Sequence, residues 1–467
     1  MKLYSNNELY KLFYGNMLDM LDIIQPQTID SIITDPPYEL NFMGKGWDNS
    51  GIAFQPDTWK KCYEVLKPGG YLLAFGGSRT FHRIACAIED AGFEIRDTIM
   101  WLYGSGFPKS MSLGKVIEGK QVLGSANVRD IKKLDGEKEI VGGGWNSNEV
   151  EQGKRNQEYE QIKTNVNYTT ELGKKWSNWG TALKPSFEPI IVARKPFKGS
   201  LVDNVIEYGV GGINIDECRV ETTDKYSYPN GPKGNTFSIR QEPDGKRNEP
   251  VESNPLGRFP ANTILTYDEN DFDEVCGGFP NTSPSKQVIG GANRKSQTQE
   301  GRISAGGWKE TNRIRKTEGY NDNGGSASRY FYCAKASKKD RDEGLDEFEE
   351  INGGSYQFRQ DGSLDGKIPV RKNTHPTVKP TDLMQYLVRL VTPNGGIVLD
   401  PFNGSGSTGK AVMYENKERN KNYKYIGIEL TKEYLPIAKA RIEYVCNLQA
   451  KELKDMQMSI FDLYKGE

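Results

Sequence analysis

The chain has 467 residues, of which 36% are hydrophobic and 27% are charged, so it is long enough to bury one large core or two smaller ones. Its formal net charge of −1 argues against a histone-like or arm-type nucleic-acid binder. A local basic face would be enough for contact with nucleic acid, so composition leaves that class open.

Cysteine and histidine usage argues against several kinds of site. The six cysteines include no CxxC pair, so we expect free thiols in a reducing cytoplasm. His82 and His375 are the only histidines, which disfavours a histidine-rich metal site or a histidine triad. Residues 1–10 are polar and no apolar run approaches 18 residues, so neither a signal peptide nor a membrane span is predicted. We therefore expect a cytoplasmic protein without a metal.

The first hundred residues show the alternating periodicities of a βα fold. In chain order they predict a helix or turn over 12–21, a strand at 29–34, a helix over 57–66, a strand at 71–75, a helix over 79–91 and a strand at 93–102. The second helix should end at Pro68-Gly69-Gly70. His82, Arg79 and Trp101 are interpreted as structural.

The tetrapeptide Asp35-Pro36-Pro37-Tyr38 follows the predicted strand 29–34. An apolar run that stops at a double proline is typical of a buried strand ending in a fixed loop. At the carboxyl edge of a sheet, open α/β folds bind ligands. Asp35 and the Pro36 carbonyl could accept both N–H bonds of an amino group on a flat ring, and Tyr38 could stack on that ring. An ordinary strand–turn is the alternative.

The middle of the chain is polar. Residues 121–178 are rich in Gly, Asn, Lys and Glu, and they predict an extended or partly disordered insertion. The core returns with a strand at 188–193. A second polar region, 201–365, contains a strand-like piece at 262–266 and basic tracts such as that of Arg313 and Arg315. Solvated loops are the plain interpretation of most of it.

The C-terminal hundred residues contain a second ligand-binding pattern. A helix over 380–392 carries an apolar stripe that belongs to the core. A strand at 396–400 then runs into a glycine loop, a helix around 410–414 and a strand at 425–429 that ends in Glu429. A glycine loop followed about 20 residues later by an acid is typical of a nucleoside-binding βαβ unit, in which the acid bonds ribose hydroxyls.

Together these segments resemble the amino-methyltransferases of DNA, which use S-adenosylmethionine and carry a DPPY-type catalytic loop and an FxGxG-type cofactor loop. The catalytic loop precedes the cofactor loop here, as in the permuted subgroup called the beta class. Residues 66–73, 179–197, 328–337 and 375–380 resemble further segments of phage and bacterial members. The resemblance implies an α/β, Rossmann-like, circularly permuted methyltransferase fold with a large mid-chain target-recognition insert.

The resemblance also divides the chain. It implies a catalytic half at 1–120, a polar insertion at 121–178, a returning core segment at 179–200, a target-recognition region at 201–365 and a cofactor-binding half at 366–467. In the target-recognition region, loops would reach the DNA grooves and phosphates. The Arg313 and Arg315 pair would contact phosphates there, with plain solvated surface as the alternative.

The family pattern assigns the site residues. The catalytic loop would be Asp35, Pro36, Pro37 and Tyr38. The cofactor-binding residues would be Asn16, Thr377, Lys379, Asp400, Phe402, Asn403, Gly404, Ser405, Gly406 and Glu429. Asn16 departs from the family, where an Asp usually bonds the adenine amine of the cofactor. Lys379 would reach the carboxylate end of the cofactor, or it is a surface residue before Pro380.

The resemblance implies methyl transfer to the exocyclic amine of a base flipped out of double-stranded DNA. Asp at the first loop position is more usual in adenine-specific members, so adenine is expected, with cytosine as the alternative. A catalytically silent DNA-binding module, and a methyltransferase of RNA or of protein glutamine, are further alternatives. Bacterial or phage members can act with a restriction system or as homodimers, and the sequence leaves both partnerships open.

Overall fold

The computed structural model describes residues 2–40, 46–103, 110–126, 135–143, 160–166, 168–221, 257–268, 281–282, 325–326, 331–336, 338–352 and 370–465. The chain divides into two compact units. One unit comprises Met1–Trp101 and Pro189–Glu467, and the other comprises Leu102–Glu188. No helix within the described residues combines the length and apolar character needed to cross a membrane.

The first unit is built on a ten-stranded sheet with the order β1-β2-β16-β15-β3-β4-β8-β5-β9-β12. Its strands are β1 (Lys2–Asn6), β2 (Tyr10–Tyr14), β3 (Ile29–Thr34), β4 (Leu66–Phe75), β5 (Glu94–Tyr103), β8 (Phe187–Arg194), β9 (Thr263–Asp268), β12 (Tyr332–Ala336), β15 (Ile397–Asp400) and β16 (Lys424–Glu429). Strands β2, β16, β15, β3 and β4 are mutually parallel, whereas β1 and β8 pair antiparallel with β2 and β4. This is a Rossmann-like α/β sheet, and its parallel centre brings the carboxyl ends of β3, β15 and β16 to one edge.

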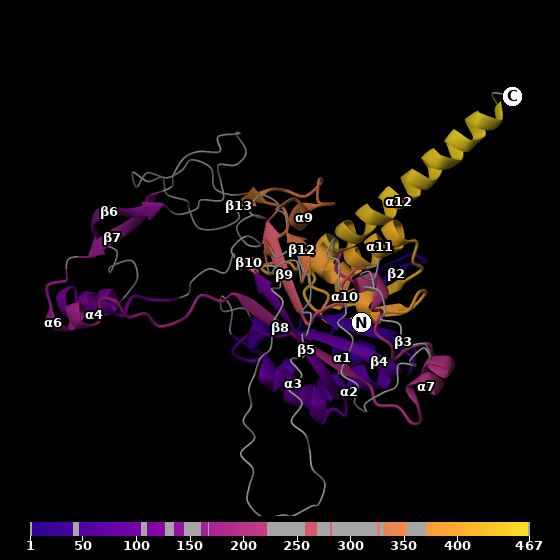
Figure 1. The fold of residues 1–467 in the computed structure, drawn as a ribbon, viewed down its shortest axis with the longest axis horizontal. Helices are drawn as coiled ribbons and strands as arrows, with labels where there is room; N and C mark the ends of the chain where they lie inside the picture. The colour runs from indigo at the N-terminus through magenta and orange to yellow at the C-terminus, as the bar shows by residue number, and fades with distance from the viewer. Residues whose placement is uncertain are drawn as a thin grey trace, which may run out of the picture. The chain divides into compact units, whose positions relative to one another are not determined.

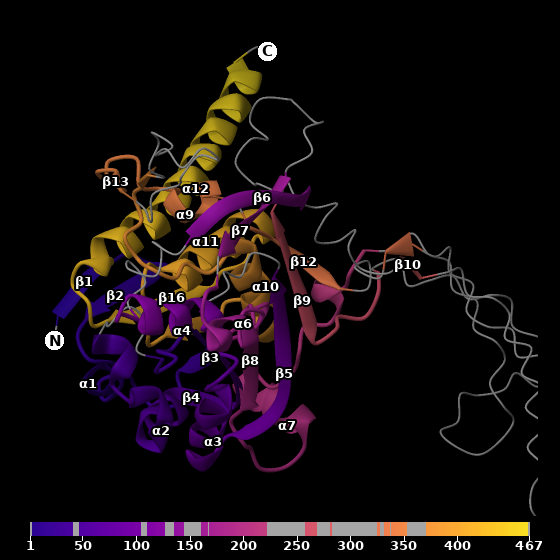
Figure 2. The ribbon, with the colours of Figure 1, turned by 90° about the vertical axis from the view of Figure 1, so that its left-hand side faces the viewer.

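Helices cover both faces of this sheet (Figure 1). One layer holds α1 (Met17–Leu21), α2 (Pro56–Val65) and α3 (Phe81–Asp90), which pack on one another. The other holds α10 (Thr381–Val391), α11 (Ser407–Arg419) and α12 (Tyr434–Lys465), drawn in orange and yellow (Figure 2). Smaller elements of this unit are α7 (Leu201–Tyr208), α9 (Lys338–Asp342), β10 (Asn281–Thr282), β11 (Gly325–Ser326), β13 (Ile351–Asn352) and β14 (Val370–Arg371).

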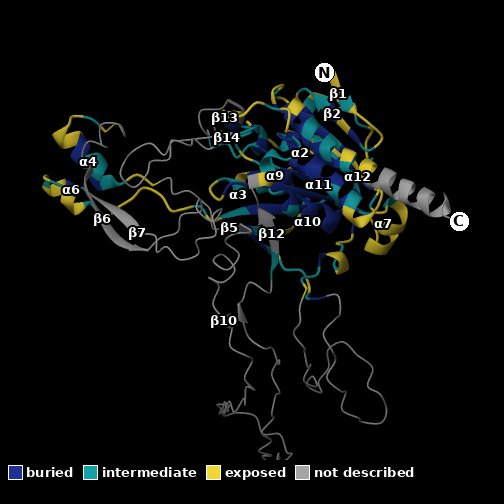
Figure 3. Ribbon diagram, turned by 90° about the horizontal axis from the view of Figure 1, so that it is seen from above, coloured by how far each residue is buried: buried dark blue, intermediate teal, exposed yellow. Residues whose placement is uncertain are grey.

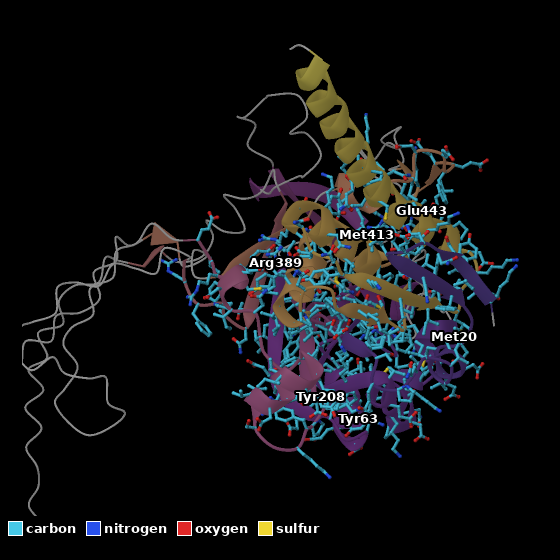
Figure 4. The ribbon with its side chains drawn as sticks, turned by 90° about the vertical axis from the view of Figure 1, so that its right-hand side faces the viewer. Met20, Tyr63, Tyr208, Arg389, Met413 and Glu443 are labelled. Carbon is cyan, nitrogen blue, oxygen red and sulfur yellow. The ribbon has the colours of Figure 1, made fainter. Side chains whose placement is uncertain are left out.

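The core lies between the sheet and the two helical layers. Figure 3 shows buried residues concentrated in the strands and in α2, α10 and α11, while α7 is exposed. Met20 of α1 and Met413 of α11, labelled in Figure 4, are both fully buried and come from opposite layers. A sheet covered on both faces explains why every residue of β3 is buried rather than every second one.

The second unit contains α4 (Leu113–Val122), the antiparallel pair β6 (Asp135–Gly143) and β7 (Glu160–Val166), and α6 (Glu171–Lys175). Glu118 of α4 accepts hydrogen bonds from the backbone and hydroxyl groups of Thr169 and Thr170 at the start of α6. These bonds hold the pKa of Glu118 at about 2, even though desolvation acts in the opposite direction. Within the predicted insertion 121–178, the described residues include the end of α4, the β6–β7 pair and α6.

Most predicted elements of the first unit are confirmed to within one or two residues, among them β3, α2, α3, β5, β8, β9, α10, β15 and β16. Two were wrong. Residues 12–14 belong to strand β2, and the helix begins only at Met17, where Asn16 caps it by accepting a hydrogen bond from the Leu18 N–H. The strand β4 starts at Leu66, directly after α2, and not at Tyr71.

Candidate active site

The predicted catalytic and cofactor segments meet although they lie near opposite ends of the chain. β3 pairs directly with β15 in parallel register, Val398 opposite Ser31 and Leu399 opposite Ile32. Both strands therefore end at the same edge, where the Thr34 hydroxyl donates to Asp400 Oδ1 at 2.7 Å. The two end segments of the chain therefore contribute neighbouring strands to one sheet.

Asp35 lies directly beyond β3, and its two carboxylate oxygens have different surroundings. Oδ2 accepts a hydrogen bond from the Lys379 ammonium at 2.6 Å. Oδ1 is buried and has no hydrogen-bond partner among the described residues. A buried carboxylate oxygen without a donor is costly, so Oδ1 is available to accept an N–H or O–H from a ligand.

Three aromatic rings surround the Lys379 ammonium, and we call them the aromatic box. The Nζ atom lies 5.4 Å from the ring centroid of Tyr38, 4.9 Å from that of Phe75 and 6.0 Å from that of Trp101. The Trp101 indole N–H donates to the Thr266 hydroxyl at 2.7 Å, which fixes that ring. Each ring follows a strand or lies at its end, so the sheet itself positions the box.

Lys379 is only 7% exposed, so its interpretation as a surface residue was wrong. Trp101, interpreted as structural, belongs to the aromatic box. The sequence signal for Phe75 and Trp101 was an aromatic residue at the carboxyl end of each of two predicted strands, a signal that strand periodicity alone does not distinguish from core.

The loop after Tyr38 is fixed by two acids that sequence reasoning missed. Glu39, the residue after Tyr38, has a left-handed backbone with a φ of 55°. Buried Asp48 accepts hydrogen bonds from the backbone N–H groups of Glu39 and Leu40 at 2.9 and 3.2 Å. The Glu39 side chain in turn accepts the Gly51 N–H at 2.8 Å.

In the predicted cofactor loop, the polar side chains are bonded within the fold. Buried Asp400 accepts from the hydroxyls of Thr34 and Thr408 and from the Phe402 N–H at 2.7, 2.6 and 3.1 Å. Asn403 Oδ1 accepts from the Tyr425 hydroxyl at 2.7 Å. These contacts hold the loop in shape from below.

Ser405 is held by Arg441, a fully buried residue of α12 that sequence reasoning missed. The Arg441 guanidinium donates to the Ser405 carbonyl at 2.9 Å and to its hydroxyl at 3.1 Å. Phe402 packs against Trp59 of α2 with ring centroids 6.5 Å apart. The loop is thus fixed from both helical layers.

Glu429 ends β16 and closes the glycine loop. Its carboxylate accepts the Gly404 N–H at 2.6 Å and the Thr431 N–H at 2.7 Å. Gly404 and Gly406 both have left-handed backbones, with φ of 52° and 77°. A Cβ at Gly404 would lie 2.9 Å from His375 Nε2, and one at Gly406 would lie 2.9 Å from Ala438 Cα, so neither position accepts a side chain.

The segment before α10 reaches the same loop. The His375 ring packs edge-on against that of Tyr434, with ring centroids 4.5 Å apart. The His375 Nδ1 atom lies 2.6 Å from the Thr377 carbonyl oxygen. Burial lowers the pKa of His375 to about 4, so its ring is neutral at pH 7. Thr377 and Asn16 are both exposed. Gly15, the residue before Asn16, donates its backbone N–H to the Glu429 carbonyl at 3.0 Å.

Two buried acids at this edge of the sheet, Asp400 and Glu429, have raised pKa values. Burial raises the pKa of Asp400 to about 6, and the nearby Asp35 carboxylate adds to the effect. Burial likewise raises the pKa of Glu429 to about 7, with Asp400 contributing. Burial and the neighbouring carboxylate disfavour the ionised forms of these two acids. A cationic ligand would favour the ionised forms and would therefore lower both pKa values.

Comparison with known proteins agrees with this arrangement. Residues 29–440 match the model of the DNA methylase family. The chain is 42% identical over 82 residues to the type II methyltransferase M2.DpnII of Streptococcus pneumoniae, covering 18% of this chain and 28% of that protein. It is 35% identical over 79 residues to the DNA adenine methyltransferase YhdJ of Escherichia coli K12, covering 17% and 25%. The chain thus matches only about a quarter to a third of the length of such curated relatives.

Among solved structures, the cytosine-N4-specific PvuII DNA methyltransferase is 12% identical with a TM-score of 0.38, over 97% of each chain. The M1.HpyAVI–SAM complex is 14% identical with a TM-score of 0.35, over 93% of this chain and 99% of that one. The family match spans both the β3 loop and the β15 loop that the fold brings together. The chain therefore belongs to the DNA methylase family.

Proposed function

We propose that this protein is a site-specific DNA methyltransferase that transfers a methyl group from S-adenosylmethionine to the exocyclic amine of adenine in DNA. The observation that carries the proposal is the buried Asp35 Oδ1, which lacks a hydrogen-bond partner among the described residues and lies beside the cofactor loop. Family membership and the named relatives support the reaction class. The permuted order of the beta class is part of the same proposal.

The residues of the β15 loop fit S-adenosylmethionine. The left-handed glycines let the loop backbone pack closely on the fold, because His375 and Ala438 occupy the space that a Cβ would need. The buried acids Asp400 and Glu429 suit a ligand that carries a sulfonium and an ammonium group. Glu429 retains lone pairs for ribose hydroxyls beside its two backbone bonds. When bound, the cofactor supplies an electrophilic methyl group on a positively charged sulfur.

The chain's own residues would activate the amine. The lone pair of an exocyclic amine is delocalised into its ring, which makes the nitrogen a poor nucleophile. Asp35 Oδ1 and the Pro36 carbonyl would accept its two N–H groups, which favours a tetrahedral nitrogen and directs the lone pair toward the methyl carbon. The transfer would be a direct in-line displacement in which the methyl–sulfur bond breaks as the methyl–nitrogen bond forms, a neutral thioether leaves, and the surplus proton of the amine passes to Asp35 or solvent. Positioning would supply most of the rate enhancement. No covalent base adduct is needed.

Tyr38 would act as the stacking platform for the flipped base. Base–aromatic stacking contributes about 1–3 kcal/mol per base and tolerates any base identity. Flipping is required because the amine is paired inside the duplex. A Cβ at Gly77 would lie 3.1 Å from Tyr38 Cδ2, so the ring rests directly on this glycine.

Cytosine is the second candidate substrate. Its exocyclic amine presents the same two N–H groups, so one unpartnered acceptor on Asp35 serves either base. Adenine remains our proposal because of the Asp in the first loop position and the relative named as an adenine methyltransferase. The choice of target sequence is assigned to residues 201–365, most of which, including Arg313 and Arg315, lie outside the described residues.

Incubation with labelled S-adenosylmethionine and mixed-sequence DNA tests the proposal. The DNA is then digested, and mass spectrometry identifies the methylated nucleoside. N6-methyladenine supports the proposal, and N4-methylcytosine selects the second candidate. Label found only in RNA or protein, or no transfer despite cofactor binding, would overturn it.

A further inference from the structure

We propose that Lys379 is a positioning residue of the catalytic loop: it fixes Asp35 by one carboxylate oxygen so that the other is presented to the substrate amine. The inference rests on the proposed function, since it names how the acceptor of that reaction is held. Lys379 would act through Asp35, and its side chain need not contact the cofactor.

The geometry of the pair supports this role. The Lys379 ammonium lies 2.6 Å from Asp35 Oδ2, and the two side chains are 8% and 23% exposed. An ammonium has three donors and no acceptor, so it can meet a carboxylate only as a donor. One oxygen is thereby engaged, while Oδ1 stays buried without a partner among the described residues. The carboxylate cannot rotate freely, because rotation would break a short charge-assisted bond.

The aromatic box keeps the ammonium in place. Attraction between a cation and a ring face is strongest when the cation is desolvated, as Lys379 is. Two of these rings, Phe75 and Trp101, pack edge to face on each other with ring centroids 6.1 Å apart. The third, Tyr38, belongs to the catalytic loop itself, so Lys379 links the acceptor and the proposed stacking platform.

The backbone of Lys379 is also anchored. Helix α10 begins two residues later at Thr381, whose N–H donates to Asp340 Oδ2 at 2.8 Å. Asp340 is itself paired with the fully buried Lys410 at 2.6 Å. A rigid helix start places the side chain more accurately than a free loop would.

The full-length protein and three variants test the role. Lys379→Gln removes the charge, and Lys379→Arg restores a cation. Lys195→Gln is the matched control, because Lys195 is also buried (6% exposed), lies 4.4 Å from the ring of Tyr63 and donates to two backbone carbonyls. Tyr63 is labelled in Figure 4.

We expect Lys379→Gln to lower kcat by about 10- to 100-fold with less than threefold changes in the KM for DNA and in the Kd for S-adenosylmethionine. A 2-aminopurine at the target position should still brighten on binding, because base flipping does not need Lys379. Lys379→Arg should recover at least a third of the lost rate, whereas Lys195→Gln should lower thermal stability without this selective loss of kcat. Unchanged kcat in Lys379→Gln, or equal losses in kcat, KM and Kd without rescue by arginine, would overturn the proposal.

A readout without turnover separates this inference from the proposed function. In protein labelled with ¹⁵N at lysine Nζ, a buried ion-paired ammonium gives a slowly exchanging resonance, which Lys379→Arg assigns. Asp35→Asn should shift it and speed its exchange, while the Lys195 resonance stays in place. If the wild-type protein methylates no DNA, the proposed function fails, and this spectrum still decides whether Lys379 is locked on Asp35. An unchanged Lys379 resonance in Asp35→Asn would overturn the pairing.

Discussion

The loops after β3 and after β15 lie side by side at one sheet edge, but they differ in how far the hydrogen-bond acceptors of their side chains are satisfied by the fold. At the β15 loop, Asp400 and Asn403, together with Glu429 at the end of β16, each accept hydrogen bonds from the fold itself. In the β3 loop, Asp35 is bonded through Oδ2 only, and its Oδ1 has no partner among the described residues.

This difference suggests that the β15 loop has a mainly structural framework, whereas the β3 loop presents a group that can react or bind. A loop whose side chains are already satisfied keeps its shape without a ligand, and it would bind the cofactor through backbone groups and residual lone pairs. A loop with an unsatisfied buried acceptor is incomplete until a donor arrives. Substitutions in the two loops should therefore fail in different ways.

The largest effect is expected from Asp35→Ala. Removal of the acceptor should lower methylation by about 1,000-fold or more, because the amine loses its activating partner. The Kd for S-adenosylmethionine should stay within about twofold, since Asp35 is outside the cofactor loop. Isothermal titration beside a methylation assay separates the two quantities. Wild-type turnover in this variant would show that the catalytic loop is wrongly assigned.

Gly406→Ala should break the cofactor loop instead. Left-handed backbone strain of about 1–2 kcal/mol adds to the contact of a new Cβ at 2.9 Å from Ala438 Cα. A total of about 3 kcal/mol would weaken S-adenosylmethionine binding about 100-fold. Gly395→Ala is the control, because Gly395 also has a positive φ, of 79°, but a Cβ there would meet no described residue within 4 Å.

Comparable losses of cofactor affinity in Gly406→Ala and Gly395→Ala would mean that strain alone matters and that the packing of the loop on α12 does not. Equilibrium unfolding of both variants measures the strain they share.

Tyr38→Ala should lower kcat/KM by about 10-fold through lost stacking on the flipped base. Affinity for non-specific DNA should change little, because stacking is available only to an extruded base. Tyr38→Phe keeps the ring and should retain most activity. Fluorescence of 2-aminopurine at the target position, followed with all three proteins, reports the flipped base directly. Equal weakening of specific and non-specific binding in Tyr38→Ala would remove the platform role.

The smallest expected effect is a pH dependence of cofactor affinity. Glu429 has a pKa of about 7 and Asp400 one of about 6, both raised by burial, so both acids ionise as the pH rises from about 5.5 to 8. A cationic ligand prefers the ionised forms, so its affinity should rise about three- to tenfold over this range, with proton release on binding. Titration calorimetry in buffers of different ionisation enthalpy measures both. Glu429→Gln should flatten the dependence.

The free protein should show the opposite trend. The folded-state pKa of Glu429 is above its unfolded value, so the native state binds more protons between about pH 4.5 and 7. Its contribution to stability is present below that window and is lost as the pH rises through it. Thermal unfolding with and without S-adenosylmethionine should therefore diverge with rising pH.

The sequence by itself determined the strands β3, β15 and β16 and the loops that follow them. Apolar runs that stop at Pro36 or at a glycine loop carry their information locally, through backbone restriction and burial. The resemblance also implied that these strands lie side by side, because the proposed amine acceptor and the proposed cofactor loop must meet, and β3 does pair with β15.

Only the tertiary structure decided which side chains complete each loop. Lys379 and Trp101 lie far from Asp35 in sequence, and no periodicity distinguishes a buried lysine that pairs with an acid from one that snorkels to solvent. The same holds for Arg441, which donates to Ser405 in the β15 loop, and for Asp48, which accepts the Glu39 N–H. Local patterns fix backbone and burial, whereas the pairing of charges depends on distances that exist only once the sheet has formed.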